Sequence, residues 1–142
     1  MSSGGAFLAR KGPETVALEE GNTVKSTRSL GPAMSHFVDP ASKDAKEVLP
    51  GIRVRAFWHE RLLASFVDLA PDAVMAPHRH PEEQFGYVIR GTMHFTLDGE
   101  TRTLREGDAY LIPPDVPHGV VAGSEGARVV DVFSPTPQRL KF

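Results

Sequence analysis

From residue 52 onward, this chain is a succession of short β-prone runs separated by turn residues. One run ends at Arg90-Gly91, and the turns between others are Asp98-Gly99, Glu106-Gly107-Asp108 and residues 123–126. Asp-Gly is a strong hairpin signal because both central residues of a type I′ turn need a positive φ. Between positions 92 and 97, apolar residues stand at every second position, which is typical of a strand with one buried face. Short, regular strands with little helix favour an antiparallel barrel or jelly roll, so the fold class is predicted as all-β.

The beginning of the chain does not share this pattern, because its residues are mixed and weakly periodic. Residues 1–33 are interpreted as an N-terminal extension that is partly flexible or packs on a partner subunit. Residues 34–142 are interpreted as a single barrel domain. Within them we expect a first strand at 34–38 and one helical turn at 43–49, which Pro50-Gly51 would end.

The composition excludes several classes of function. The chain has 142 residues, 40% hydrophobic and 24% charged, which suits one globular domain. Its formal net charge is -2 and its basic residues are scattered, so neither nucleic acid nor a membrane surface is expected as a partner. It has no cysteine, which excludes disulfides, a zinc–thiolate site and a cysteine nucleophile. Without an apolar run typical of a signal peptide or of a membrane span, a cytoplasmic protein is expected.

Three histidines and one glutamine indicate a metal site. His78 and His80 are two residues apart, and in a strand such residues share a face with Cα atoms roughly 6.5–7 Å apart. A second strand could bring His118 to the same ion, and Gln84 could supply an amide oxygen. Three imidazoles and one neutral oxygen leave room for water or substrate, which is typical of a catalytic metal. The alternative is surface histidines near turns, but the whole constellation favours a metal.

The sequence offers two alternatives to Gln84 as the fourth ligand, because Glu82 and Glu83 are nearby. Glu83 has the wrong strand parity, and Glu82 would need an irregular turn, so Gln84 is preferred. A neutral ligand leaves the ion its full charge and makes it the stronger Lewis acid. The ligand set predicts one divalent ion, Fe, Ni, Mn or Zn, without separating these metals.

These residues resemble the two motifs of the cupin superfamily. The first motif is matched at His78, His80, Gln84 and Gly91, with Ala73 near its opening glycine, and the second at Gly107, Pro113 and His118. Two positions depart from the pattern, because Asp115 replaces a glycine and Ala122 stands where an asparagine usually closes the second motif. The resemblance covers about residues 51–134 and implies an antiparallel double-stranded β-helix, the cupin jelly-roll barrel.

A narrower resemblance is to the small single-domain cupins of the KdgF type, which convert unsaturated uronates toward their linear keto form. It is carried by the stretches HRHPEEQ, IPPDVPHG and DVFSP. In that group the metal ligands match His78, His80, Gln84 and His118, and pocket residues that serve the reaction match Asp131 and Phe133. An arginine is also used there, for which Arg139 is the nearest candidate. The resemblance further implies a homodimer.

For several other polar residues, the sequence is compatible with two different roles. Asp131 lies among valines and is expected to be buried, where it either orients a ligand histidine or acts as a general acid or base. The hydroxyl of Tyr110 either donates to a substrate or only packs. Arg53 and Arg55 share one face of a strand, either as solvated charges or, if they point inward, as a clamp for a carboxylate.

The function predicted from these observations is a metal-dependent enzyme acting on a small, oxygen-rich, carboxylate-bearing molecule. Isomerase or lyase chemistry on an unsaturated uronate or related sugar acid is favoured, with Asp131, Phe133 and Tyr110 as catalytic residues. One alternative is a metal-dependent dioxygenase. Another is a metal-dependent module that binds a small molecule without turnover.

Overall fold

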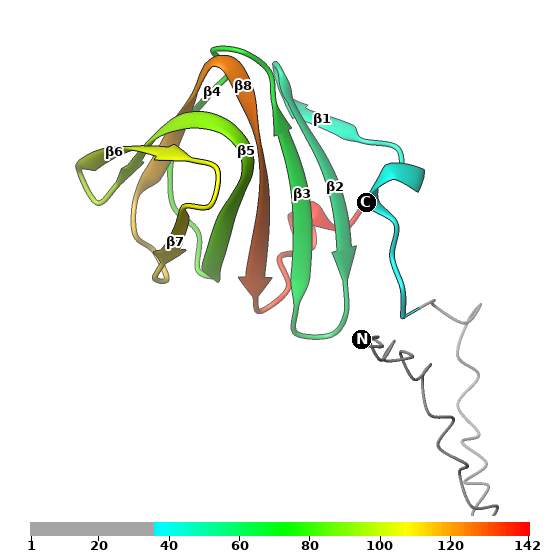
Figure 1. The fold of residues 1–142 in the computed structure, drawn as a ribbon. Coiled ribbons are helices and arrows are strands. Elements are labelled where there is room, and N and C mark those ends of the chain that lie inside the picture. The colour runs from blue at the N-terminus through cyan, green and yellow to red at the C-terminus, as the bar shows by residue number, and fades with distance from the viewer. Residues whose placement is uncertain (1–35) are drawn as a thin grey trace, which may run out of the picture. The chain divides into compact units, whose positions relative to one another are not determined.

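The computed structural model describes residues 36–142, which form an antiparallel β-barrel (Figure 1). The strands are β1 (Lys46–Leu49), β2 (Ile52–Trp58), β3 (Leu63–Leu69), β4 (Val74–His78), β5 (Glu83–Leu97), β6 (Glu100–Arg105), β7 (Ala109–Ile112) and β8 (His118–Ser134). Two short 3-10 helices, η1 (Pro40–Ser42) and η2 (Gln138–Leu140), precede and follow the strands. The all-β prediction is confirmed. The predicted extension 1–33 lies outside the described residues.

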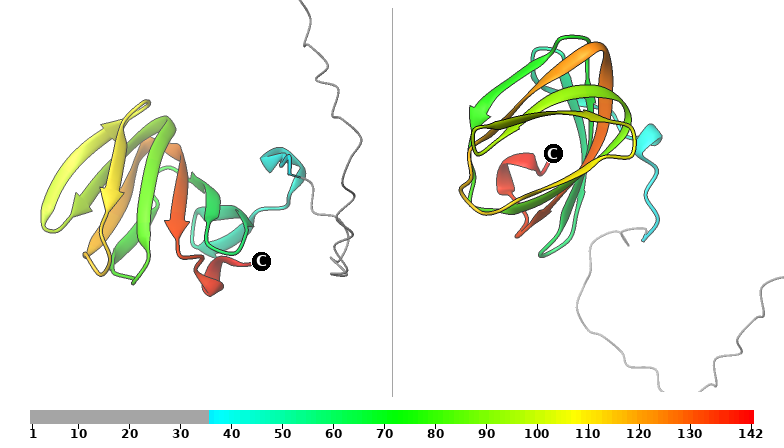
Figure 2. Two further views of the ribbon diagram at one scale, coloured as in Figure 1. Left: turned by 90° about the horizontal axis from the view of Figure 1, so that it is seen from below. Right: turned by 60° about the vertical axis from the view of Figure 1, so that its left-hand side comes forward.

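The sheet curves so that its strands enclose a common interior (Figure 2). Its strands are ordered β1-β2-β3-β8-β5-β6, with β4 also paired to β8 and β7 to β5. All of these pairings are antiparallel. β5 and β8 pair along nearly their whole length, so these two long strands belong to both walls of the barrel.

The bends in β5 and β8 depend on glycines. Gly91 has φ 81° and Gly126 has φ 74°, and the β5–β8 register shifts on both sides of Gly91. A Cβ atom on Gly91 would overlap the carbonyl oxygen of Gly126. Positive φ and close backbone approach are both conditions that favour glycine. The strands therefore continue through these positions, where the sequence predicted that one strand ends at Arg90-Gly91 and that residues 123–126 form a turn.

Alternation along the strands decides which side chains enter the barrel. On β2, Ile52, Val54 and Ala56 are buried, whereas Arg53 and Arg55 lie on the other face, as the solvated-charge interpretation requires. Arg55 pairs with Asp68, 3.0 Å away. Neither arginine lines the main cavity of the barrel.

The segment before β2 differs from expectation. The described part of 34–38 forms no strand, and residues 43–49 form strand β1 at their C-terminal end instead of a helical turn. Lys43 explains part of this arrangement, because its ammonium donates to the carbonyl oxygens of Ala56 and Phe142. These bonds tie an extended segment to two distant parts of the barrel, so long-range contacts override local propensity.

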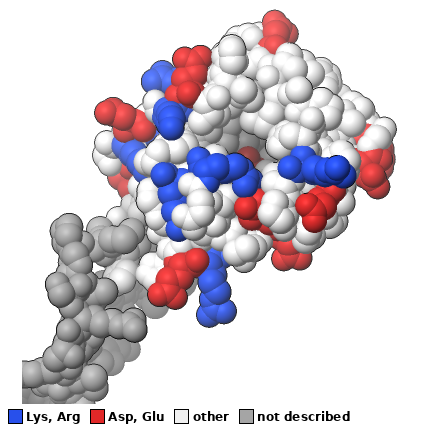
Figure 3. Space-filling view, turned by 180° about the vertical axis from the view of Figure 1, so that it is seen from behind, with Lys and Arg blue, Asp and Glu red and all other residues white. Residues whose placement is uncertain are grey.

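Charge is unevenly distributed on the surface seen from behind. A broad region there carries no Lys, Arg, Asp or Glu, and basic and acidic groups lie side by side along its border (Figure 3). Because the two signs are interspersed, this face has no uniform basic patch of the kind that nucleic acid binding requires. Within the described part of the chain, we find no helix with the length and hydropathy of a membrane span.

Gly91→Ala tests the role of the bend. We expect the free energy of unfolding to fall by about 3 kcal/mol, because the added methyl group meets backbone atoms and the positive φ becomes strained. Gly99→Ala is the matched control: Gly99 also has a positive φ (81°), but a Cβ there meets nothing within 4 Å. Its expected loss is only about 1–2 kcal/mol. Urea denaturation measures both variants, and equal losses would contradict the steric account.

Candidate metal centre

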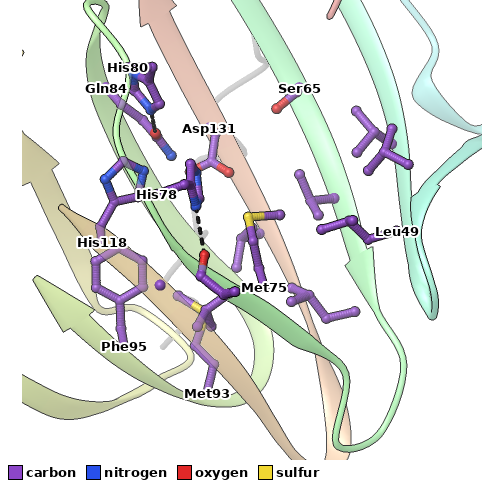
Figure 4. Close-up of a pocket in the computed structure, with 18 of the residues that line it drawn as sticks. Leu49, Ser65, Met75, His78, His80, Gln84, Met93, Phe95, His118 and Asp131 are labelled. Atoms are coloured by element: carbon purple, nitrogen blue, oxygen red, sulfur yellow. Dashed lines mark hydrogen bonds between the residues drawn. The ribbon is translucent and has the colours of Figure 1, made fainter. Parts of the chain in front are cut away.

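Three histidines meet inside the barrel because strands β4 and β8 pair at their ends. His78, the last residue of β4, lies directly opposite His118, the first residue of β8. His80 follows two residues after β4. One ring nitrogen from each of the three lies within 4.8 Å of the others, and the rings face a common space (Figure 4). The structure thus brings together side chains that are 40 positions apart in the sequence.

The orientation of each imidazole is set by a backbone carbonyl. The Nδ1 atoms lie 3.0 Å from the carbonyl oxygen of Ala76 for His78, 3.0 Å from that of Glu82 for His80, and 2.8 Å from that of Val116 for His118. A carbonyl oxygen only accepts hydrogen bonds, so each Nδ1 carries the proton. The Nε2 lone pairs of the neutral rings are then directed toward the shared space, which is the usual arrangement of histidines that ligate a metal.

Gln84 links the histidines to a buried carboxylate. Its Oε1 lies 3.0 Å from Nε2 of His80, and its side-chain amide also hydrogen-bonds to Asp131. Because Asp131 accepts, the NH₂ group of Gln84 faces it and the oxygen faces the histidines. Two acceptors, a bare imidazole nitrogen and an amide oxygen, are stable side by side when a cation or a proton lies between them. This donor set fits a divalent ion.

Burial also favours the metal-binding form of His118, of which 4% is exposed. Burial lowers the pKa of His118, and the neighbouring His78 and His80 lower it further, while the hydrogen bond to Val116 opposes this change. A neutral imidazole is the form that ligates metals. The environment of His118 therefore keeps the ring ready for an ion at neutral pH.

Asp131 and Tyr110 form a buried pair beside the histidines. The Tyr110 hydroxyl donates to Oδ1 of Asp131 over 2.6 Å. Burial raises the pKa of Asp131 to about 6, although the hydrogen bonds from Tyr110 and Gln84 oppose the rise. Burial, and next the Asp131 charge, raises the pKa of Tyr110 well above its ordinary value. The sequence left the orientation of Tyr110 open, and the structure directs its hydroxyl inward.

Gly86 makes this pair possible. It lies on β5 between its register partners Tyr110 on β7 and Asp131 on β8. A Cβ atom at position 86 would overlap the ring of Tyr110. The missing side chain lets the tyrosine reach across β5 to the carboxylate of the next strand. A glycine at an inward position of a strand often marks such a close approach, so this signal was present in the sequence.

Glu82 holds two functional groups in place. Its carboxylate pairs with Arg139 in a bidentate manner, with N–O distances of 3.0 and 3.1 Å, and its Oε2 lies 3.2 Å from Nδ1 of His80. Burial alone would raise the pKa of Glu82, but the hydrogen bonds and charge of Arg139 hold that pKa below its usual range. The carboxylate lies on the Nδ1 side of His80. Glu82, an alternative ligand by sequence, thus orients a predicted ligand instead.

The predicted site residues surround one cavity of about 520 Å³. Phe133 is 6% exposed and packs edge-on against His80, with ring centroids 5.6 Å apart. Arg139, the nearest candidate for the arginine that the resemblance implies, also lines the cavity. Ser65, a buried polar residue that sequence reasoning missed, faces the cavity opposite Asp131 on the neighbouring strand. The cavity is of the size that small-molecule sites have.

Comparisons with known proteins identify the family of this chain. Residues 65–133 match the family described as Cupin domain. The pectin degradation protein KdgF of Dickeya dadantii is 38% identical over 102 residues, which are 70% of this chain and 92% of that protein. The dimethylsulfoniopropionate lyase DddW of Ruegeria pomeroyi is 36% identical over 73 residues, 51% of this chain and 48% of that protein.

Among solved structures, KdgF from Halomonas sp. has a TM-score of 0.70 and 36% identity, covering 73% of this chain and 96% of that one. The chain belongs to the cupin family. It is a small cupin similar to KdgF, as its sequence motifs indicate, and its histidine cluster supports a metal-binding member of the family.

Gly86→Ala tests the tyrosine–carboxylate pair. We expect the methyl group to displace Tyr110, so that the pKa of its phenol moves down toward the ordinary value. The chain has two tyrosines, so a Tyr87→Phe background isolates the signal of Tyr110 in a near-ultraviolet pH titration. Tyr87→Phe alone is the control. An unchanged, high pKa in a folded Gly86→Ala protein would show that the glycine is not needed for this contact.

Proposed function

We propose that this chain is a metal-dependent isomerase or lyase that moves a proton within a small carboxylate-bearing molecule. The observation that carries the proposal is one cavity lined by three convergent imidazoles, an amide oxygen and a buried carboxylic acid. A Lewis acid next to a group that can exchange a proton is the combination that proton-transfer chemistry at a carbonyl requires.

The proposed ligands of the ion are His78, His80, Gln84 and His118. When bound, one divalent ion, Fe, Ni, Mn or Zn, would polarise a carbonyl or hydroxyl oxygen of the substrate. Backbone carbonyls accept hydrogen bonds from the Nδ1 atoms of the three histidines, and the Glu82 carboxylate also lies beside Nδ1 of His80. These contacts are on the side of each ring that faces away from the proposed ion. Such outer contacts orient the rings and raise their basicity.

Asp131 is proposed to move the proton. It faces the cavity, and the NH₂ group of Gln84 connects it to the ligand set. Tyr110 donates to Oδ1 of Asp131, which orients the carboxyl group. A carboxyl group with a pKa near 6 can both take and return a proton near neutral pH.

Arg139 and Phe133 are proposed to position the substrate. The side chain of Arg139 is 48% exposed, and Glu82 holds its guanidinium group at the cavity. The remaining N–H groups of this guanidinium can bind a carboxylate. Phe133 closes the cavity beside His80 and keeps water from that wall. The similarity to KdgF makes an unsaturated uronate the first compound to assay.

His118→Ala tests the proposed metal centre. We expect the purified variant to lose its divalent ion, because the remaining ligands hold it more weakly, and Gln84→Ala to lose it less completely. His94→Ala is the control, since His94 lies on the outside of β5, where it contacts Thr103. Elemental analysis by mass spectrometry measures all three variants. Full metal occupancy in His118→Ala would remove this residue from the ligand set.

Asp131→Asn tests the proposed proton transfer. Turnover of the acid that the native protein converts, with unsaturated uronate assayed first under anaerobic conditions, is expected to fall by about 10²- to 10⁴-fold while the metal content is retained. Asp68→Asn, a carboxylate paired with Arg55 outside the cavity, should leave turnover unchanged. Oxygen consumption by the iron-loaded protein would favour a dioxygenase instead, and tight binding without turnover would favour a binding module.

We further propose that two copies of the chain pair through the outer face of β5 and β7. Phe85, Tyr87 and Leu111 lie there with 42%, 40% and 71% of their surface exposed, and Phe85 is the register partner of Leu111. Adjacent exposed apolar side chains on a pair of strands are typical of an interface.

Leu111→Lys tests this pairing. Light scattering is expected to report a dimer for the native chain and a monomer for Leu111→Lys, because a desolvated ammonium disrupts an apolar interface. Leu62→Lys is the matched control, because it makes the same substitution at an exposed leucine in the β2–β3 turn, away from the proposed face. It should leave the dimer intact. A native monomer, or an intact dimer in Leu111→Lys, would contradict the proposed face.

A further inference from the structure

The walls of the cavity change from polar to apolar along the strands. Ser65 of β3 and Asp131 of β8 are register partners and form a polar rung. Two residues further along β3, the next pair of register partners that faces the cavity is Val67 and Val129. On β2, Val54 is the register partner of Val67 and continues this apolar row. All of these side chains line the same cavity. The polar groups of this wall are therefore confined to one end.

The opposite wall changes in the same direction. His78 and His118 form the polar rung where β4 meets β8. Further along these strands, Met75 pairs with Val120, and Phe95 of β5 pairs with Val120 from the other side. Figure 4 shows the polar side chains grouped together, with Met75, Met93 and Leu49 beyond them.

Among the described residues 36–142, no hydrogen-bonding side chain lines the apolar half of the cavity. It is lined by residues such as Val54, Val67, Leu69, Met75, Met93 and Val129. A hydroxyl group placed there loses its water partners, which weakens binding by roughly 5- to 100-fold for each group. A methylene group placed there gains about 4-fold in affinity. The apolar half of the cavity therefore favours hydrocarbon groups of a ligand over hydroxyl groups.

We propose that the substrate of this site has its oxygen atoms at one end and a hydrocarbon chain or ring at the other. The head, a carboxylate with a neighbouring carbonyl or enol oxygen, lies against the histidines, Asp131 and Arg139. The hydrocarbon part fills the apolar half. The inference rests on the proposed function for the chemistry of the head, and it narrows the substrate from hydroxylated sugar acids to acids with an apolar tail.

The test is a titration calorimetry series on the zinc-loaded chain of 142 residues. The ligands are 2-oxobutyrate, 2-oxopentanoate, 2-oxohexanoate and 2-oxooctanoate, which share one head, together with glucuronate as a hydroxylated acid. We expect Kd to fall by about 3- to 4-fold for each added methylene, and 2-oxohexanoate to bind at least 10-fold more tightly than glucuronate. A Kd that does not change with chain length, or tighter binding of glucuronate, would overturn the inference.

A pair of matched variants assigns the effect to the cavity. Val67→Thr introduces one hydroxyl into the apolar half with little change in volume, and Val130→Thr makes the same change on a residue of β8 that does not line the cavity. We expect Val67→Thr to weaken 2-oxohexanoate by at least 5-fold and to leave 2-oxobutyrate unchanged, whereas Val130→Thr changes neither. Equal effects of the two variants would overturn the assignment. Unchanged binding of 2-oxobutyrate also shows that Val67→Thr is folded.

This experiment measures binding and not turnover, so the two proposals fail separately. A graded chain-length series without any catalysed proton transfer supports the apolar-tailed ligand and contradicts the proposed enzyme. Turnover of unsaturated uronate together with a flat series supports the enzyme and contradicts the apolar tail.

Discussion

The antiparallel pairing of β5 with β8 is the interaction on which the rest of the structure depends. The two strands pair in both walls of the barrel and bend together where Gly91 meets Gly126. Before the bend, β5 places Gln84 and Gly86 beside the Asp131 end of β8. After it, the same two strands place Leu97 beside His118. The pairing of β5 with β8 thus helps to bring Asp131 and His118, which lie toward opposite ends of β8, to a single cavity.

Gln84 connects these two ends because an amide is both a donor and an acceptor. Its oxygen faces the histidines and its NH₂ group faces Asp131. A glutamate at this position would direct a second carboxylate at Asp131, and the two charges would repel each other unless one was protonated. The glutamine therefore lets a metal site and a buried acid lie side by side without a direct charge conflict.

Much of the site was predictable because it depends on local rules. Residue spacing alone suggested both the barrel and a cluster of His78, His80 and His118, and the resemblance to cupins supported both. The reason given for His78 and His80 was wrong, because β4 ends at His78 and the two residues do not share a strand face. The inward direction of Tyr110 and the approach of Arg139 were not predicted. Each depends on a partner far away in the sequence, Gly86 and Glu82 respectively, which only the folded chain brings into contact. The continuity of β5 and β8 through their glycines was missed for the same reason.

The central claim is that three imidazoles converge on one ion inside the barrel. X-ray absorption spectroscopy of the zinc-loaded protein tests it most directly, because multiple scattering from imidazole rings counts the histidine ligands. The account predicts three histidine nitrogens at about 2.0–2.1 Å, with the remaining positions filled by oxygen. A spectrum with only oxygen ligands, or with a single imidazole, would contradict it.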